Sequence, residues 1–212
     1  MKKYIIALAA LVFTVAIQSC NTESKKETTT TMDGMTNKDS MTMDHKNMEG
    51  MHSMNGMKMT GDFDYDFANT MVMHHQSAVD MAKEVISKGS NAEVKTMAQN
   101  IVTAQEAEIA QFKNITANYK MPEMKEESKE AHNELGETME KMETKMKGMS
   151  KTGNADKDFL MMMIPHHESA VTMGEDQLSH GKNLELKKMA QKIMEDQSKE
   201  IKQFEAMLAK MK

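Results

Sequence analysis

The sequence predicts an all-α protein in which two repeated helical hairpins form a four-helix bundle. Residues 63–112 align with residues 155–204 without a gap, and 24 of the 50 aligned positions are identical. Such repeats gain a continuous core by packing on one another. Aromatic residues make up 4 % of the chain, tryptophan is missing and only two prolines occur, a composition that favours helices over a β-sandwich.

The first twenty residues predict an export signal followed by a lipid anchor. Lys2 and Lys3 precede an apolar stretch, residues 5–17, which is too short to cross a bilayer as a permanent helix. Cys20 is the only cysteine and stands where a bacterial lipoprotein signal is cut and lipidated. We therefore expect residues 1–19 to be a signal peptide. The mature lipoprotein would lie in the bacterial cell envelope, on the periplasmic side or on the surface of the outer membrane, with a plainly secreted protein as the alternative.

Residues 20–61 are polar and of low complexity, and they predict a lipidated, disordered tether. Nine of the 28 methionines lie in this segment, although a disordered segment has no core for them to fill. Thioether and imidazole groups together suit Cu(I), whereas compositional bias is the alternative explanation. The tail residues expected to bind copper are His45, His52, Met48, Met51 and Met54.

The first hairpin is expected over residues 62–118 and the second over residues 155–212. Gly89 and Gly181 are natural C′ residues to end the first helix of each copy. Between the copies, residues 119–154 predict a charged, Met-rich linker helix. Three of its methionines share one face, for which packing against the bundle is favoured over a metal relay: Met139, Met142 and Met146.

His74 lies in the apolar stripe that the first helix is expected to bury. Folding the hairpin back about its glycine pairs apolar residues with one another, for example Phe67 with Phe112. The polar layers expected in this register pair Met71 with Glu108 and His74 with Gln105, and in the second copy Met163 with Glu200 and His166 with Gln197.

Two interpretations of these layers stay open. The imidazoles could be hydrogen-bonded by Gln and Glu in a layer that sets the bundle register, since an unsatisfied buried polar group costs about 1–3 kcal/mol. Alternatively, His and Met could ligate a metal while Gln105, Glu108, Gln197 or Glu200 orients the imidazole. Pro165 interrupts the helix directly before His166, so the two sites are not expected to be equivalent.

The segments "DFANTMVMHHQSAVDMA" and "DFLMMMIPHHESAVTMG" resemble an exported family called domain of unknown function 305. The resemblance covers residues 63–116 and 155–208. It implies a ferritin-like helical bundle, and some relatives are associated with copper binding and copper tolerance. Carried onto this sequence, the resemblance implies as metal ligands Met71, His74, His75, Met81, Met163, His166, His167 and Met173.

We therefore expect an envelope lipoprotein that binds copper for buffering, tolerance or transfer. Cu(I) is favoured over Ag(I) or Cu(II), and a copper-handling protein is a further expected partner. The net charge is −5 and all 27 basic residues are lysine, which argues against nucleic acid. No catalytic activity is expected, because neither hairpin has the Glu-x-x-His pairs of a carboxylate oxidase. The alternative is a helical interaction or structural module with a buried His-Gln-Glu layer and no metal.

Overall fold

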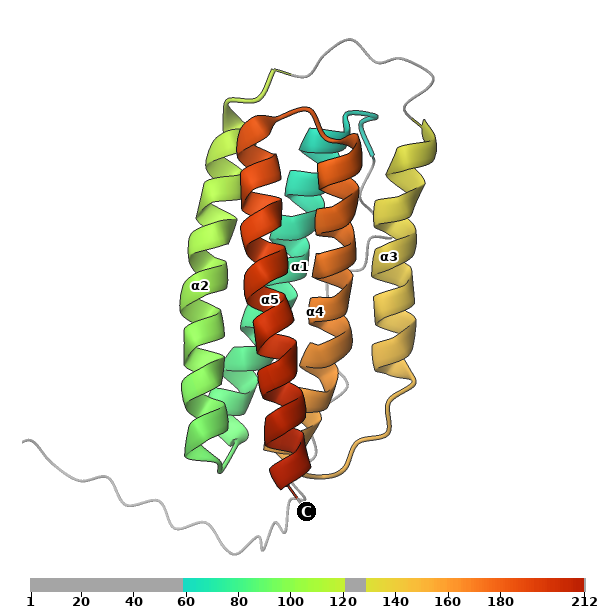
Figure 1. Cartoon of the computed structure of the whole chain (residues 1–212). Coiled ribbons are helices and arrows are strands. Elements are labelled where there is room, and N and C mark those ends of the chain that lie inside the picture. Colours follow the sequence, from blue (N-terminus) through green and yellow to red (C-terminus); the bar gives the residue numbers. More distant parts are fainter. Residues whose placement is uncertain (1–58, 121–128, 212) are drawn as a thin grey trace, which may run out of the picture. The chain divides into compact units, whose positions relative to one another are not determined.

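The computed structural model describes residues 59–120 and 129–211, which contain five helices and no strand. The predicted signal peptide, Cys20 and residues 20–58 of the predicted tether lie outside these residues. The last three residues of that tether, 59–61, are part of the fold rather than disordered, since Met59 packs against the core and Thr60 hydrogen-bonds to Asp66. The all-α prediction is confirmed. The helices are α1 (Phe63–Lys88), α2 (Ala92–Ala117), α3 (Lys129–Lys147), α4 (Ala155–His180) and α5 (Leu184–Lys210), shown in Figure 1.

Each copy of the sequence repeat is one antiparallel hairpin. α1 packs most extensively on α2, and α4 packs most extensively on α5. The hairpins meet along α1 and α4, while α2 and α5 make few close backbone approaches to one another. α3 lies beside α4 in Figure 1 and also contacts α1. The expected four-helix bundle is therefore present, with the linker helix added to one side of it.

The helices begin where side chains satisfy the first backbone amides. Asp62 caps α1 and Asn154 caps α4. Each side chain accepts a hydrogen bond from the backbone N–H of the third residue of its helix. Asn91 and Asn183 each accept two such bonds, at the starts of α2 and α5. Because free N–H groups at a helix start need acceptors, these four residues define the helix starts.

Gly89 and Gly181 end α1 and α4 as predicted, but neither has the left-handed conformation common at such glycines. Gly89 has φ −69° and Gly181 has φ −66°, both in the extended region that any residue adopts. Instead, a Cβ on Gly89 would collide with the Asp156 carboxylate and the Val85 carbonyl oxygen, and one on Gly181 would collide with the Gln177 side chain. Close approach of neighbouring atoms, not backbone conformation, is the reason for glycine here.

The two copies also bind each other's turns. Asp156, in the first turn of α4, accepts hydrogen bonds from the backbone N–H groups of Ser90 (2.8 Å) and Asn91 (3.0 Å). Asp64 holds the equivalent place in α1. Its partners in the second turn are the backbone N–H groups of Lys182 and Asn183, both at 2.9 Å. The start of α1 therefore lies at the end of α4 and the reverse, so these two helices are antiparallel.

The methionine face of α3 packs into the bundle, as favoured from the sequence. Leu135, Met139, Met142 and Met146 are all buried and belong to the core. Pro165 lies inside α4, but the helix continues across it from Ala155 to His180. No helix in the described ranges is both long and apolar enough to cross a membrane.

The hydrophobic core consists of two clusters with a polar layer between them. α1 contributes residues up to Met71 to the first cluster and from Ala78 onward to the second. α4 contributes residues up to Met163 to the second cluster and from Ala170 onward to the first. The interval on both helices holds four fully buried imidazoles, here called the histidine layer: His74, His75, His166 and His167.

Candidate metal centre

His74 and His166 form a close pair with tilted rings at the contact between α1 and α4. Their ring centroids are 3.7 Å apart, and both side chains are fully buried. His74 Nε2 lies 3.0 Å from the carbonyl oxygen of His166 and 2.8 Å from Ser169 Oγ. His166 Nε2 lies 3.1 Å from the carbonyl oxygen of His74 and 2.8 Å from Ser77 Oγ. Each copy therefore holds the imidazole of the other by the same set of contacts.

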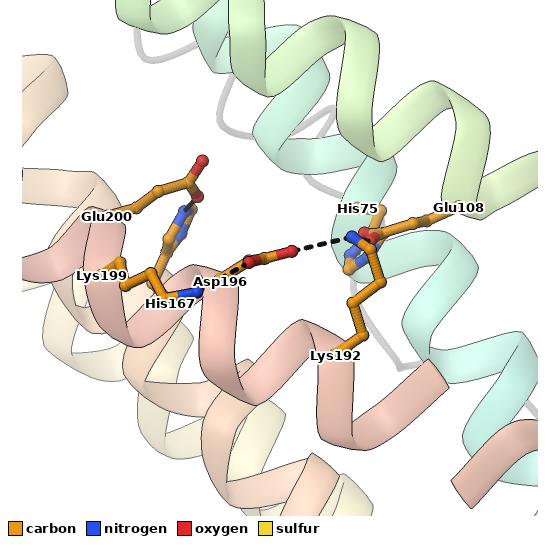
Figure 2. Close-up of polar contacts among 7 residues, drawn as sticks. All are labelled: His75, Glu108, His167, Lys192, Asp196, Lys199 and Glu200. Atoms are coloured by element: carbon orange, nitrogen blue, oxygen red, sulfur yellow. Dashed lines mark hydrogen bonds and ion pairs between the residues drawn. The ribbon is translucent and has the colours of Figure 1, made fainter. Parts of the chain in front are cut away.

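His75 and His167 point away from that pair, toward α2 and α5. His75 Nε2 lies 3.0 Å from Glu108 Oε2, and His167 Nε2 lies 2.8 Å from Glu200 Oε2. Figure 2 shows both pairs. The imidazoles are completely covered, whereas the Glu108 and Glu200 side chains are 13 % and 25 % exposed. Each carboxylate therefore lies between solvent and a buried imidazole.

These contacts correct the polar layers predicted from the hairpin register. Glu108 was expected opposite Met71 but binds His75, and Glu200 was expected opposite Met163 but binds His167. His74 was expected to meet Gln105, yet its partners are on α4, because its face of the helix lies at the contact between the copies. His166 likewise contacts α1 instead of Gln197. The apolar layers were predicted correctly, as with Phe67 and Phe112, whose ring centroids are 5.9 Å apart.

All four imidazoles have the same tautomer and leave the same atom without a partner. A carbonyl or carboxylate oxygen can only accept, so each Nε2 carries the ring hydrogen and each Nδ1 presents a lone pair. Within the described ranges, none of the four buried Nδ1 atoms has a hydrogen-bond partner. An unsatisfied buried acceptor costs about 1–3 kcal/mol, which a cation bound to the lone pair would offset. The histidine layer therefore fits a metal ion.

Three of these imidazoles, those of His74, His166 and His167, also favour the neutral form that a metal ligand must have. Burial lowers the pKa of His74 and of His166 well below the usual histidine value, and the neighbouring histidines lower it further. Burial lowers the pKa of His167 as well, although Glu200 opposes the shift. Burial alone would raise the pKa of Glu108, but the hydrogen bond from His75 and the charge of Lys192 outweigh this effect and lower it.

The predicted methionines flank the histidine layer on both sides. Met71 and Met173, from different copies, belong to the first core cluster. Met163 belongs to the second cluster, and Met81 packs against both. The sequence predicted that each hairpin would use its own methionines. In the structure, the antiparallel contact of α1 and α4 places methionines from both copies in the same core cluster.

Met142 of α3 is a further thioether at the layer that sequence reasoning did not place there. Its Sδ lies 3.1 Å from Ser169 Oγ, the hydroxyl that contacts His74. The helical spacing of Met139, Met142 and Met146 predicted a buried face, but the sequence does not show which residues of the bundle this face contacts. Gln105 and Gln197, predicted to orient the imidazoles, are buried and have side-chain atoms without a hydrogen-bond partner among the described residues.

The donor set of this layer is imidazole and thioether. No three His, Cys, Asp or Glu side chains in residues 59–120 and 133–211 are arranged to hold a metal together. A metal bound in the layer would therefore use methionine beside histidine, a soft combination that suits Cu(I) better than Mg²⁺ or Ca²⁺.

Solved structures with the same fold include copper-bound and silver-bound proteins. CopM in the Cu(I)-bound form is 28 % identical, with a TM-score of 0.53, over 70 % of this chain and 96 % of CopM. CopM in the Ag-bound form obtained by soaking is 29 % identical, with a TM-score of 0.53, over 73 % of this chain and 98 % of CopM. A putative secreted DUF305 protein from Streptomyces coelicolor is 22 % identical, with a TM-score of 0.56, over 72 % and 95 % of the two chains, and shows the fold alone.

The family comparison covers both hairpins. No functionally curated protein matches the sequence. A family model described as "Domain of unknown function (DUF305)" matches residues 16–116 and 64–208. The second match contains both His-His segments and nearly the whole of the four bundle helices, so the chain belongs to the DUF305 family.

Proposed function

We propose that this protein binds copper, with Cu(I) as the favoured ion, in the histidine layer of its bundle. The observation that carries the proposal is the set of four buried Nδ1 lone pairs without partners, flanked by methionines. CopM, which shares the fold, has structures in Cu(I)-bound, Cu(II)-bound and Ag-bound forms. Copper is the cargo here, and the proposal includes no catalytic step.

We infer further that the protein is an exported lipoprotein whose tail captures copper for the bundle. The support is the short apolar segment before Cys20 and the methionines and histidines that follow it. His45 and His52 lie among these methionines, where they combine imidazole with thioether in a segment without a predicted core.

An anaerobic Cu(I) titration against a competing chelator tests both parts of the proposal. It compares residues 20–212 carrying Cys20→Ser with residues 59–212, which keep the Thr60 contacts to Asp66 at the start of α1. Tight binding by residues 59–212 is expected, with additional equivalents bound by the longer protein. Binding confined to the longer protein would assign copper to the tail alone.

Variants of the shorter protein identify the ligands. Changing all four layer histidines to alanine is expected to abolish tight binding, and circular dichroism of the variant checks that the helices remain. His180→Ala is the matched control, because this histidine is exposed and pairs with Glu134 on the surface. Unchanged affinity in the folded quadruple variant would refute the site.

A structural module is the second candidate, favoured by the hydrogen bonds of the Nε2 atoms. All four rings are already held by a carbonyl, hydroxyl or carboxylate oxygen. If this were their whole role, copper would change neither the thermal stability of the bundle nor the histidine NMR signals. Ligand binding to the folded state alone raises stability by mass action, so the copper proposal requires an increase in Tm.

A further inference from the structure

The two His–Glu pairs at the edge of the histidine layer differ in their charged surroundings. Lys192 of α5 reaches across to α2, where its Nζ lies 3.4 Å from Glu108 Oε1. The same Nζ lies 2.7 Å from Asp196 Oδ2, which keeps the ammonium group in place. Figure 2 shows Lys192 beside the His75–Glu108 pair, with Asp196 and Lys199 on the same helix. Glu108 is therefore shared between an imidazole and a cation.

The other pair has no such cation. The position equivalent to Lys192 in the first copy is Asn100, which is exposed and uncharged. The equivalents of Asp196 and Lys199 are Ala104 and Ala107. Among the described residues, Glu200 forms an ion pair with His167 alone. Its side chain is also about twice as exposed as that of Glu108, 25 % against 13 %.

This difference in nearby charge changes the affinity of each His–Glu pair for a monovalent cation that enters the layer. A carboxylate at the surface attracts Cu⁺, but an ammonium group in contact with that carboxylate cancels most of the attraction and repels the ion. One unit charge near the ion, screened by salt and partly offset by the Asp196 carboxylate, changes the affinity for a monovalent ion by about three- to tenfold. Lys192 therefore disfavours ion binding at His75 relative to His167.

We propose that the two halves of the histidine layer load in order: a soft monovalent cation binds at His167, beside Glu200, before it binds at His75, where Lys192 covers Glu108. The proposal rests on the proposed copper function and deepens it. The two sites of the repeat are then unequal because of one surface lysine, rather than because of the proline inside α4.

Ag(I) titration followed by NMR tests the order of loading. Ag(I) is diamagnetic and not oxidised by air, so the imidazole nitrogen signals of each histidine can be followed in the full chain. Cys20→Ser is included throughout, because the single thiol would otherwise take up silver. The Nδ1 signal of His167 is expected to reach half its shift at a free Ag(I) concentration about three- to tenfold lower than that of His75.

Three surface variants separate the role of Lys192 from a general effect of charge. Lys192→Asn is expected to remove the difference between the two midpoints by improving binding at His75. Lys199→Asn makes the same change of net charge on the same helix, and this lysine contacts Asp196 rather than Glu108, so the difference should persist. Asn100→Lys introduces the cation on the Glu200 side and should weaken binding at His167.

The outcomes separate the order of loading from the existence of the copper site itself. Equal midpoints in the unaltered protein, or a difference that survives Lys192→Asn, would overturn the order of loading while leaving the copper site intact. A difference lost equally in Lys192→Asn and Lys199→Asn would assign the effect to net charge and overturn the role of the Glu108 contact. If no layer histidine responds to Ag(I) at any concentration, the proposed function itself fails.

Discussion

The side chain of each layer histidine divides two tasks between its two nitrogens. Nε2 donates to a fixed oxygen and thereby sets the ring orientation, as His75 does with Glu108 and His74 does with the His166 carbonyl. Nδ1 keeps its lone pair. In metalloproteins such a hydrogen bond at one nitrogen fixes the tautomer and raises the basicity of the other. The structural and the metal-binding interpretations of the layer therefore concern different atoms of the same rings.

At this scale, Met71→Leu and Met163→Leu test the thioethers. Both side chains are fully buried, and exchanging Met for Leu conserves volume, so the free energy of unfolding should fall by less than about 1.5 kcal/mol. Cu(I) affinity should nevertheless fall by about tenfold or more, since even changes to residues that only orient ligands cost that much.

The measurement is a chelator competition beside denaturant unfolding. Met207→Leu is the control, because Met207 is buried on α5 in the second cluster, well beyond the layer in sequence. If Met207→Leu weakened copper binding as much as Met71→Leu, the thioethers would not be ligands in the layer.

The pH dependence of stability follows from the lowered pKa values of His74 and His166. Below about pH 6.5 these histidines take up protons in the unfolded chain but stay neutral in the fold. The unfolded state then binds more protons, so the free energy of unfolding of the metal-free protein should decrease as pH falls. The decrease should be about 1.4 kcal/mol per pH unit for each histidine, down to its lowered pKa.

Urea unfolding at pH 7.5, 6.5 and 5.5 measures this effect. Above pH 7 both states hold these imidazoles neutral, so little further change is expected from them. A free energy of unfolding that stayed constant between pH 6.5 and 5.5 would contradict the burial of neutral imidazoles.

At the scale of the elements, the glycines at the hairpin turns end their helices because of tertiary packing rather than backbone conformation. Gly89 ends α1 as predicted, but its φ is negative, and glycine is needed because α4 approaches closely through Asp156. α3 behaves as its methionine spacing predicts, since one face is buried while the charged side chains from Glu134 onward lie outside the core. Local periodicity thus describes an element well and its neighbours poorly.

Gly89→Ala should destabilise the protein by about 1–3 kcal/mol, the usual cost of forcing an extra methyl group into filled space. Gly136→Ala is the matched control on α3, where an added Cβ meets no atom within 4 Å. That change should be neutral or stabilise by about 0.5–1 kcal/mol, because alanine favours helix. Thermal unfolding of both variants measures the difference, and equal effects would contradict the close approach seen at Gly89.

At the scale of the whole bundle, the hairpins are joined by reciprocal contacts. Asp64 binds the turn of the second copy, Asp156 binds the turn of the first, and the close His74–His166 pair lies between them. Because each copy completes the polar contacts of the other, one hairpin alone would lose these partners and expose its apolar contact face to water. The histidine layer exists only where both copies are present.

Asp156→Ala tests this joining of the copies. The change removes the acceptor of two backbone N–H groups at the start of α2, which should cost about 1–2 kcal/mol in the free energy of unfolding. Asp80→Ala is the control, since Asp80 is exposed on α1 and accepts a surface hydrogen bond from Gln76 of its own helix. Denaturant unfolding compares the variants. Equal losses would show that the contact between copies contributes no more than an average surface residue.

Much of the fold was predictable because it depends on local pattern. The repeat, the two hairpins, the buried face that contains Phe67 and His74, and the packed methionine face of the linker helix all follow from residue spacing along one helix. The candidate residues of the layer were predictable too, since His74, His75, His166 and His167 recur in the same context in both copies.

The sequence by itself thus determined the class of the fold, the hairpins and the place of His74 and His166 in the buried stripes of their helices. Only the tertiary structure decided that His74 meets His166, that His75 meets Glu108, and that Met142 reaches the layer. The physical reason is that a helical repeat reports the period of each buried face, whereas the rotation and register between packed helices depend on how side chains of both copies fit together.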